Sequence, residues 1–134
     1  MAWTEPKTDW VNGDRFNVSD YTRIKGNIEY VQQLINTLYT SYTPTSLISG
    51  VNNAYIPHVE FFNRIVTAMN ELPAHSIEPR AWQTLRTSYV ANQPAWDGAE
   101  LNRIEGNLSI LKILLENQKS GLRVMAFRLG GVSF

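Results

Sequence analysis

The chain has 134 residues, which is enough for one domain with a modest hydrophobic core. Twelve basic and twelve acidic side chains give a formal net charge of zero, so we expect no electrostatically driven binding to nucleic acid or to an anionic membrane. The absence of cysteine excludes disulfides and thiolate chemistry. The start of the chain lacks the basic-then-apolar layout of a signal peptide and no apolar run approaches transmembrane length, so we expect a soluble cytosolic product.

Residues 1–15 are expected to form an extended arm, because they contain Pro6 and a turn-like Asn-Gly-Asp sequence at 12–14. The arm also carries two large aromatic side chains, Trp3 and Trp10, whose apolar surface is costly to leave in water. These tryptophans either pin the arm onto its own domain or dock on a neighbouring subunit. They are therefore interface candidates.

A nine-residue stretch at 20–28 is repeated in variant form at 100–108. Both copies read acid, apolar, any residue, Arg-Ile, charged, Gly-Asn, apolar, and both continue into apolar tails. A repeated helix of this kind indicates a packing unit rather than an active site, because catalysis seldom needs the same side chains twice at such a distance. The repeated arginine, glycine and asparagine positions are Arg23, Gly26, Asn27, Arg103, Gly106 and Asn107.

A helix start signal precedes each copy. In the first, Asn17 can cap the free backbone N–H groups, and Asp20 at the third helical position can reach back to the cap residue. Phe16 and Tyr21 complete the signal as a hydrophobic staple. The same four roles are filled in the second copy by Trp96, Asp97, Glu100 and Leu101.

These signals predict two helices, over residues 17–38 and 97–118, each with one apolar face at the helical period. Gly26 and Gly106 lie opposite that face. Because a mid-helix glycine costs about 0.5–1 kcal/mol relative to alanine, the pair suggests close approach of another backbone, within the monomer or at a subunit interface. The two apolar faces comprise Ile24, Ile28, Val31, Ile35 and Leu38, and Ile104, Leu108, Leu111 and Leu115.

The repeated polar side chains have structural interpretations. Asn27 and Asn107 lie at the edge of the apolar face, where an amide can hydrogen bond to the backbone of a neighbouring segment. Arg23, Arg103 and the related Arg64 are expected to contact a loop carbonyl or an acid near a helix start, although arginines at such positions can also bind an anion.

A weaker copy of the pattern lies between the other two, at 61–65, without the Gly-Asn pair. Shared ancestry and coincidence are both open explanations for it. We predict a helix over 57–72, because its first residue is a proline, which is favoured at that position. Residues 41–55 are expected to form a loop with a short helical turn at 45–48, and residues 80–90 a short helix.

The C-terminal residues 122–134 alternate between two faces, which is the period of a β-strand. The preceding Ser120-Gly121 pair is interpreted as a helix stop. Because a single strand is not stable alone, its partner must be the N-terminal arm, another short segment, or a strand of another subunit. The interface candidates of this segment are Met125, Phe127, Leu129 and Phe134.

The expected fold is therefore a mainly α single domain over residues 1–134, a small helical bundle with a duplicated helix motif. It comprises an extended aromatic arm at 1–15, a helical core at 16–120 and a short C-terminal β-strand at 122–134. No linker in the sequence is typical of a domain boundary.

The sequence contains few features that indicate catalysis. His58 and His75 are the only histidines, and neither lies in a metal-binding spacing such as His-x-x-x-His. There is no Gly-x-Ser-x-Gly elbow, and Gly130-Gly131 is too short to cradle a phosphate. We therefore predict a protein that is not an enzyme, with no catalytic, cofactor or metal residues. A small wall hydrolase is a weaker alternative, because sequence does not exclude paired acids.

Seven segments, taken in order along the chain, make up a further pattern. They are Trp3-Thr4, Lys7–Trp10, Gly13–Asn17, Asp20–Ile24, Asn27–Tyr30, Leu101–Glu105 and Phe127–Phe134. Together they resemble small virion proteins and fibre-associated domains of phages and prophages in Gram-positive bacteria. In those proteins an aromatic arm leads into a Phe-Asn-x-x-Asp-Tyr-x-Arg-Ile helix, and an Asn-Arg-Ile-Glu helix follows. The chain departs from the pattern at Gly98-Ala99, where polar or acidic residues are commoner.

The resemblance implies a structural protein of the tail, baseplate, neck or fibre attachment, made in the host cytoplasm and carried in the virion. It implies other virion proteins and further copies of the chain as partners, whereas the neutral charge argues against nucleic acid and membrane. The alternative is a secreted helical-hairpin effector of Gram-positive bacteria, because Trp96-Asp97-Gly98 superficially matches a Trp-x-Gly turn. A helix that begins at Asp97 would separate the two.

Overall fold

The computed structural model describes residues 3–52, 59–86 and 97–131, with side chains up to residue 121. The described residues form helices joined by extended segments and contain no strand, so the mainly α prediction is confirmed. The helices are α1 (Val18–Leu38), α2 (Val59–Ala74) and α3 (Gly98–Gly131).

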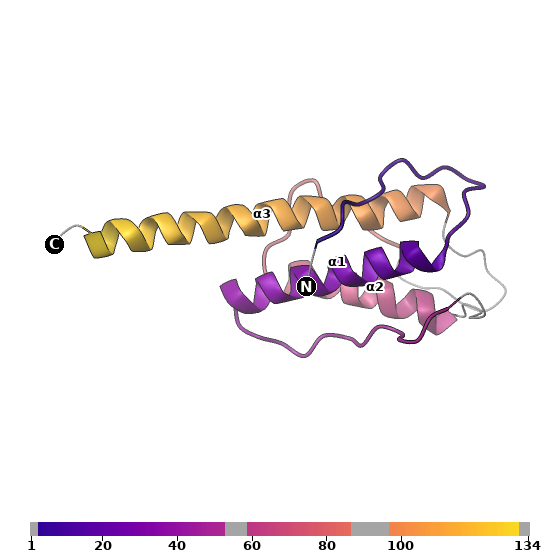
Figure 1. Cartoon of the computed structure of the whole chain (residues 1–134), viewed down its shortest axis with the longest axis horizontal. Helices are drawn as coiled ribbons and strands as arrows, with labels where there is room; N and C mark the ends of the chain where they lie inside the picture. The colour runs from indigo at the N-terminus through magenta and orange to yellow at the C-terminus, as the bar shows by residue number, and fades with distance from the viewer. Residues whose placement is uncertain (1–2, 53–58, 87–96, 132–134) are drawn as a thin grey trace.

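The three helices run in the same direction, and long segments return the chain between them (Figure 1). Side-chain contacts between α1 and α3 advance together along both helices, which fixes their parallel orientation. Arg23 pairs with Glu105 at 2.7 Å, and the Tyr30 hydroxyl donates to Glu116 at 2.6 Å. Parallel neighbours require such returns, because the end of one helix lies a full helix length from the start of the next.

The hydrophobic core lies between the apolar faces of the helices. The faces predicted for α1 and α3 are buried as expected, except that Leu38 at the end of α1 is only partly buried. The apolar face of α2 completes the core with Phe61, Ile65, Met69 and Leu72. Because each fully buried large apolar side chain contributes about 1.5–3 kcal/mol, this core supplies the main driving force for folding.

Both predicted helix starts are present. The N–H of Asn17 donates to Asp20 Oδ2 at 2.8 Å, and the N–H of Glu100 donates to Asp97 Oδ1 at 2.8 Å. α3 therefore begins next to Asp97, as predicted, whereas Trp96 lies outside the described residues. The Glu100 carboxylate is used differently from that of Asp20, since it accepts the backbone N–H of Arg86 at 3.0 Å.

The predicted C-terminal strand is wrong, because α3 continues as a helix through Ser120-Gly121 to Gly131. A left-handed residue that would end the helix is not found at Gly121: among the described glycines, only Gly13 and Gly50 have positive φ. A strand needs a partner, and the described residues offer none, whereas a helix satisfies its own backbone hydrogen bonds.

The connecting segments also differ from expectation. Residues 45–48 form no helical turn, and residues 80–86 contain only a turn at 80–81; residues 87–90, the rest of that predicted helix, lie outside the described residues. Hydrogen bonds from the helices to these backbones explain the difference, as described below for Thr45 and Gln83. The described part of α2 begins at Val59 and ends at Ala74, close to the predicted end; the predicted first residues of that helix lie outside the described residues.

For the two repeated glycines, close approach of a backbone within the monomer is not found among the described residues, and the alternative of a subunit interface stays a prediction. A Cβ added at Gly26 or Gly106 would meet no described atom within 4 Å, so no described backbone approaches there. The close approach occurs instead at Gly98, the first residue of α3. A Cβ at Gly98 would lie 2.8 Å from the carbonyl carbon of Val11, in the turn that ends the arm. The Asn12 side chain also accepts the Gly98 N–H at 2.9 Å.

We expect Gly98→Ala to destabilise the protein by about 1–3 kcal/mol, because the new methyl group meets backbone that cannot rotate away. The matched controls are Gly26→Ala and Gly106→Ala, which should stabilise it by about 0.5–1 kcal/mol through higher helix propensity. Urea unfolding followed by circular dichroism measures all three. Equal effects at the three positions would contradict the assignment of the close contact to Gly98.

The segment after α1 is attached to Glu71 of α2 and to His75, the residue that follows α2. Glu71 accepts both the N–H and the hydroxyl of Thr45, at 2.9 and 2.6 Å. The Tyr42 ring stacks on His75 with centroids 4.0 Å apart. The buried Tyr42 hydroxyl has no hydrogen-bond partner among the described residues, and this burial, together with the charge of Glu71, raises the pKa of Tyr42 to about 12.

We expect Tyr42→Phe to raise the free energy of unfolding by about 1 kcal/mol at neutral pH, because it removes a buried hydroxyl that lacks a partner. The advantage should grow above pH 10. There the unfolded wild type loses its phenolic proton while the folded form keeps it up to about pH 12, so the wild type is destabilised as pH rises. Chemical unfolding of both proteins between pH 7 and 11 tests this, and a constant difference would refute it.

Candidate functional site

The arm lies along α1 and α3 and is hydrogen bonded to both helices (Figure 1); we call this region of contact the arm groove. Two asparagine side chains hold the arm backbone there. Asn27 of α1 accepts the Thr4 N–H at 2.9 Å and donates to the Thr4 carbonyl at 2.8 Å. Asn102 of α3 accepts the Trp10 N–H at 2.8 Å and donates to the Trp10 carbonyl at 2.9 Å. Each amide thus satisfies both polar groups of one arm residue, as a neighbouring strand would.

The centre of the arm groove is the carboxylate of Glu105, which is completely buried. It accepts two hydrogen bonds from the arm, from the Lys7 N–H at 3.1 Å and the Trp10 indole N–H at 2.5 Å. It accepts two more from Arg23 of α1, through Nε at 2.7 Å and Nη2 at 2.9 Å. One acid therefore joins the arm, α1 and α3.

Arg23 supplies the charge that balances Glu105. Its guanidinium donates hydrogen bonds to Glu105 from two nitrogens and to Asp20 from the third, at 3.0 Å. The hydrogen bond to Glu105 raises the pKa of Arg23 above its ordinary value, although burial opposes the change. The predicted contact between this arginine and an acid near a helix start is therefore present, and it recurs as Arg103 with Glu100 at 2.7 Å.

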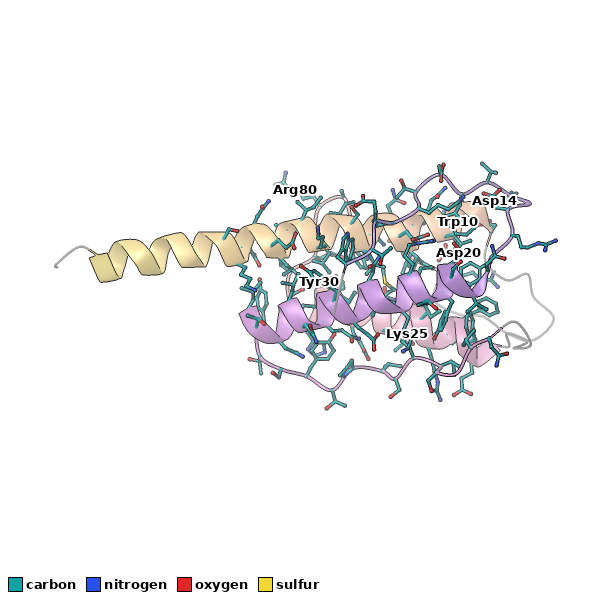
Figure 2. The ribbon with its side chains drawn as sticks, in the orientation of Figure 1. Trp10, Asp14, Asp20, Lys25, Tyr30 and Arg80 are labelled. Carbon is teal, nitrogen blue, oxygen red and sulfur yellow. The ribbon has the colours of Figure 1, made fainter. Side chains whose placement is uncertain are left out.

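The two arm tryptophans both pack on their own chain. Trp10 is 4% exposed and lies against the first part of α3, where its indole N–H reaches Glu105 (Figure 2). Trp3 is partly buried, with its ring 5.6 Å from that of Tyr30 and the Lys112 ammonium 5.1 Å above it. The structure thus brings these two predicted interface residues to the arm groove.

The remaining interface candidates lie elsewhere. Met125, Phe127 and Leu129 fall in the last part of the α3 backbone, and Phe134 lies outside the described residues. The last part of α3, which contains the first three, does not lie beside the arm groove (Figure 1).

The second copy of the repeat uses its asparagine in the same way. Asn107 accepts the Gln83 N–H at 2.9 Å and donates to the Gln83 carbonyl at 2.8 Å. Asn27 and Asn107 each bind the segment that precedes their own helix, at separations of 23 and 24 residues. The predicted role of these asparagines is therefore confirmed. Glu71 does the equivalent in α2, binding Thr45 at a separation of 26 residues.

The sequence analysis did not identify Glu105 as the centre of the arm groove. The available signal was a difference between the repeats, because the position of Glu105 in the second copy is occupied by Lys25 in the first. Lys25 is only partly buried and lies 3.9 Å from Glu29 of the same helix. A charge that changes sign between otherwise matching helices marks a position whose surroundings differ.

A cavity of about 350 Å³ lies where the arm turn meets the starts of α2 and α3. Two acids line it, Asp14 and Asp97. Each accepts a backbone N–H, that of Val11 at 3.0 Å and that of Glu100 at 2.8 Å, and so stabilises a turn or a helix start. In the described ranges no group of three histidine, cysteine or acidic residues is placed to hold a metal ion.

No protein-family model, curated protein or solved structure matches the chain. Within the described residues, no helix is long and apolar enough to cross a membrane. The geometry of the arm groove is therefore the main guide to its role. Its polar side chains bind the chain's own backbone and one another, and this arrangement fixes the arm in place.

We expect Glu105→Gln to lower the free energy of unfolding by about 3–5 kcal/mol, because it leaves the charge of Arg23 without its main partner in a partly buried site. The matched control is Glu116→Gln on the same helix, where the acid is more exposed. Its loss should stay below about 1 kcal/mol. Urea unfolding followed by tryptophan fluorescence and circular dichroism compares them, and similar losses for both variants would contradict the central role of Glu105.

Proposed function

We propose that the protein is a non-enzymatic structural component of a phage or prophage virion, in the tail, baseplate, neck or fibre attachment. The observation that carries this proposal is how polar residues of the two repeat copies are used. Asn27, Asn102 and Asn107 bind backbone, and Glu105 and Arg23 neutralise each other. Side chains that hold a rigid shape suit a building block better than a catalyst, and all of these except Asn107 belong to the virion-like segments.

The proposed mechanism has two parts. The bundle of α1, α2 and the first part of α3 is the rigid body, braced by the arm groove. The last part of α3 projects beyond it and offers a contact to other subunits (Figure 1). The proposed partners are other virion proteins and further copies of the chain, with no role for nucleic acid or membrane. The protein would be made in the host cytoplasm and then incorporated into the particle.

The secreted helical-hairpin alternative has less support. That reading requires Trp96-Asp97-Gly98 to form a turn between two helices. Asp97 instead accepts the Glu100 N–H at 2.8 Å, and Gly98 is the first residue of α3. No described contact favours the alternative.

The proposal predicts that the protein copurifies with particles. Particles from a producing strain would be banded on a density gradient, and peptides of this chain quantified by mass spectrometry against the major capsid protein. A constant ratio to the capsid protein across the band is expected. The control uses lysate from a strain whose particles lack the gene for this protein. Free protein is added to that lysate before it is loaded on the same gradient.

Two outcomes would overturn the proposal. Protein that stays at the top of the gradient while particles band below it would show that it is not a virion component. Protein that accumulates in the medium of intact cells, without lysis, would favour the secreted alternative.

A further inference from the structure

The arm ends in a turn whose two central residues are Asn12 and Gly13. The N–H of Asp14 donates to the Val11 carbonyl at 3.1 Å and closes the turn. Gly13 has a φ of 97°, which a residue without a side chain adopts at little cost. All four residues are exposed. The turn predicted from the Asn-Gly-Asp sequence is therefore present, and it contains the only asparagine of the chain that precedes a glycine.

An asparagine before a glycine can lose its side-chain amide without an enzyme, and asparagine is among the thermolabile residues. The backbone nitrogen of the glycine attacks the side-chain carbonyl carbon, and a succinimide ring forms as ammonia leaves. Water then opens the ring at one or the other of its carbonyl groups, which yields aspartate or isoaspartate. Glycine permits the attack best, because no Cβ hinders the approach of its nitrogen.

Two features of the turn favour this reaction at Asn12. The first concerns the nucleophile. Among the described residues the Gly13 N–H has no hydrogen-bond acceptor, and it lies in an exposed turn where solvent can take its proton. The second concerns the electrophile. The N–H of Gly98, the first residue of α3, donates to Asn12 Oδ1 at 2.9 Å. Negative charge develops on this oxygen during the attack, and a backbone donor at the positive end of a helix stabilises it.

The related sequence Asp97-Gly98 serves as an internal comparison, because an aspartate before a glycine can form the same ring. There the attacking nitrogen would be that of Gly98, whose proton is held by Asn12. The Asp97 carboxylate accepts the Glu100 N–H at 2.8 Å, and this bond holds it over the first turn of α3. The single hydrogen bond from Gly98 to Asn12 therefore promotes the reaction at the first site and opposes it at the second.

We propose that Asn12 is a site of spontaneous deamidation in the folded protein. The Gly13 nitrogen forms a bond to Asn12 Cγ, and the bond from Cγ to the amide nitrogen breaks. The proton of the Gly13 nitrogen passes through solvent to the departing amide nitrogen, which leaves as ammonia. One water molecule then adds across a C–N bond of the ring. The net change converts an amide and water into a carboxylate and ammonium, so water is the only co-reactant.

Conversion to isoaspartate would loosen the junction between the arm and α3. The main chain then runs through the former side chain of Asn12, so the group that accepts the Gly98 N–H is displaced and the turn becomes longer. The structure leaves no room for a longer turn, because a Cβ at Gly98 would already lie 2.8 Å from the carbonyl carbon of Val11. The biological significance rests on the proposed virion role, since a protein in an assembled particle is not replaced by new synthesis. The chemistry rests on the turn alone.

The test is peptide mapping by mass spectrometry after the full chain has been incubated at neutral and at mildly alkaline pH. Trypsin cleaves after Lys7 and Arg15, and Asn12 is the only asparagine in the fragment between them. We expect this fragment to show the mass increase of an amide converted to an acid, faster at the higher pH, with isoaspartate as one product. The internal control is the fragment 104–112, whose only asparagine is the buried Asn107, and it should stay unchanged.

A synthetic peptide of residues 8–15 gives the rate that the sequence alone produces. Asn12 should convert at least as fast in the folded protein as in the peptide, because Gly98 donates to its side chain only in the folded protein. Slower conversion in the folded protein overturns the proposal, and so does equal conversion at Asn12 and Asn107. The matched variant is Asn12→Gln, which keeps an amide on a longer side chain and should release no ammonia from this fragment.

The effect on the junction is measured by urea unfolding of the converted protein. The isoaspartate form should have a lower midpoint than Asn12→Asp, which adds the same charge but keeps the ordinary backbone, and equal midpoints would refute the loosening. These measurements need no particles. Conversion at Asn12 in a protein that fails to band with particles would refute the proposed function alone. A protein that bands with particles but keeps its Asn12 amide while the peptide converts would refute the deamidation site alone.

Discussion

The structure depends on one buried carboxylate. Glu105 has no access to solvent and would be strongly destabilising as an isolated charge in the core. It is stable there because Arg23 neutralises it and because two donors from the arm complete its hydrogen bonds. The arm therefore cannot leave without exposing an incompletely paired charge. A segment with no regular secondary structure is in this way made part of the core, and α1 and α3 are held in one register.

The same logic explains the unusual connections. Parallel helices force the chain to return over the length of the bundle each time, and an extended return leaves its backbone groups without partners. Each helix solves this with a side chain aimed at the segment before it: Asn27 for the arm, Glu71 for the second segment, and Asn107 for the third. The unit is thus an extended segment plus a helix, and the polar residue is what joins them.

Much of the fold could be predicted from the sequence, because it follows from local rules. The caps at Asn17 and Asp97 and the apolar faces depend only on residues within a few turns, and the asparagines at the edge of those faces had few partners other than backbone. Glu105 could not be predicted in the same way, since its donors lie 82 to 98 residues away along the chain. The prediction for the C-terminal segment was wrong for another reason. Its apolar residues fit both a period of two and a heptad, and only the length of the preceding helix decides between them.

The common direction of the three helices has an electrical consequence. Peptide dipoles add along a helix, so three parallel helices place three partially positive ends together and three partially negative ends apart from them. An acid occupies the first turn of each helix, Asp20, Glu60 and Glu100, and offsets the positive end. The last turns of α1 and α2 contain no base. The cations of this region belong to α3 where it passes beyond them, at Lys119, Arg123 and Arg128. A chain of zero net charge is therefore still polar along its axis, and the electric field differs between its two ends.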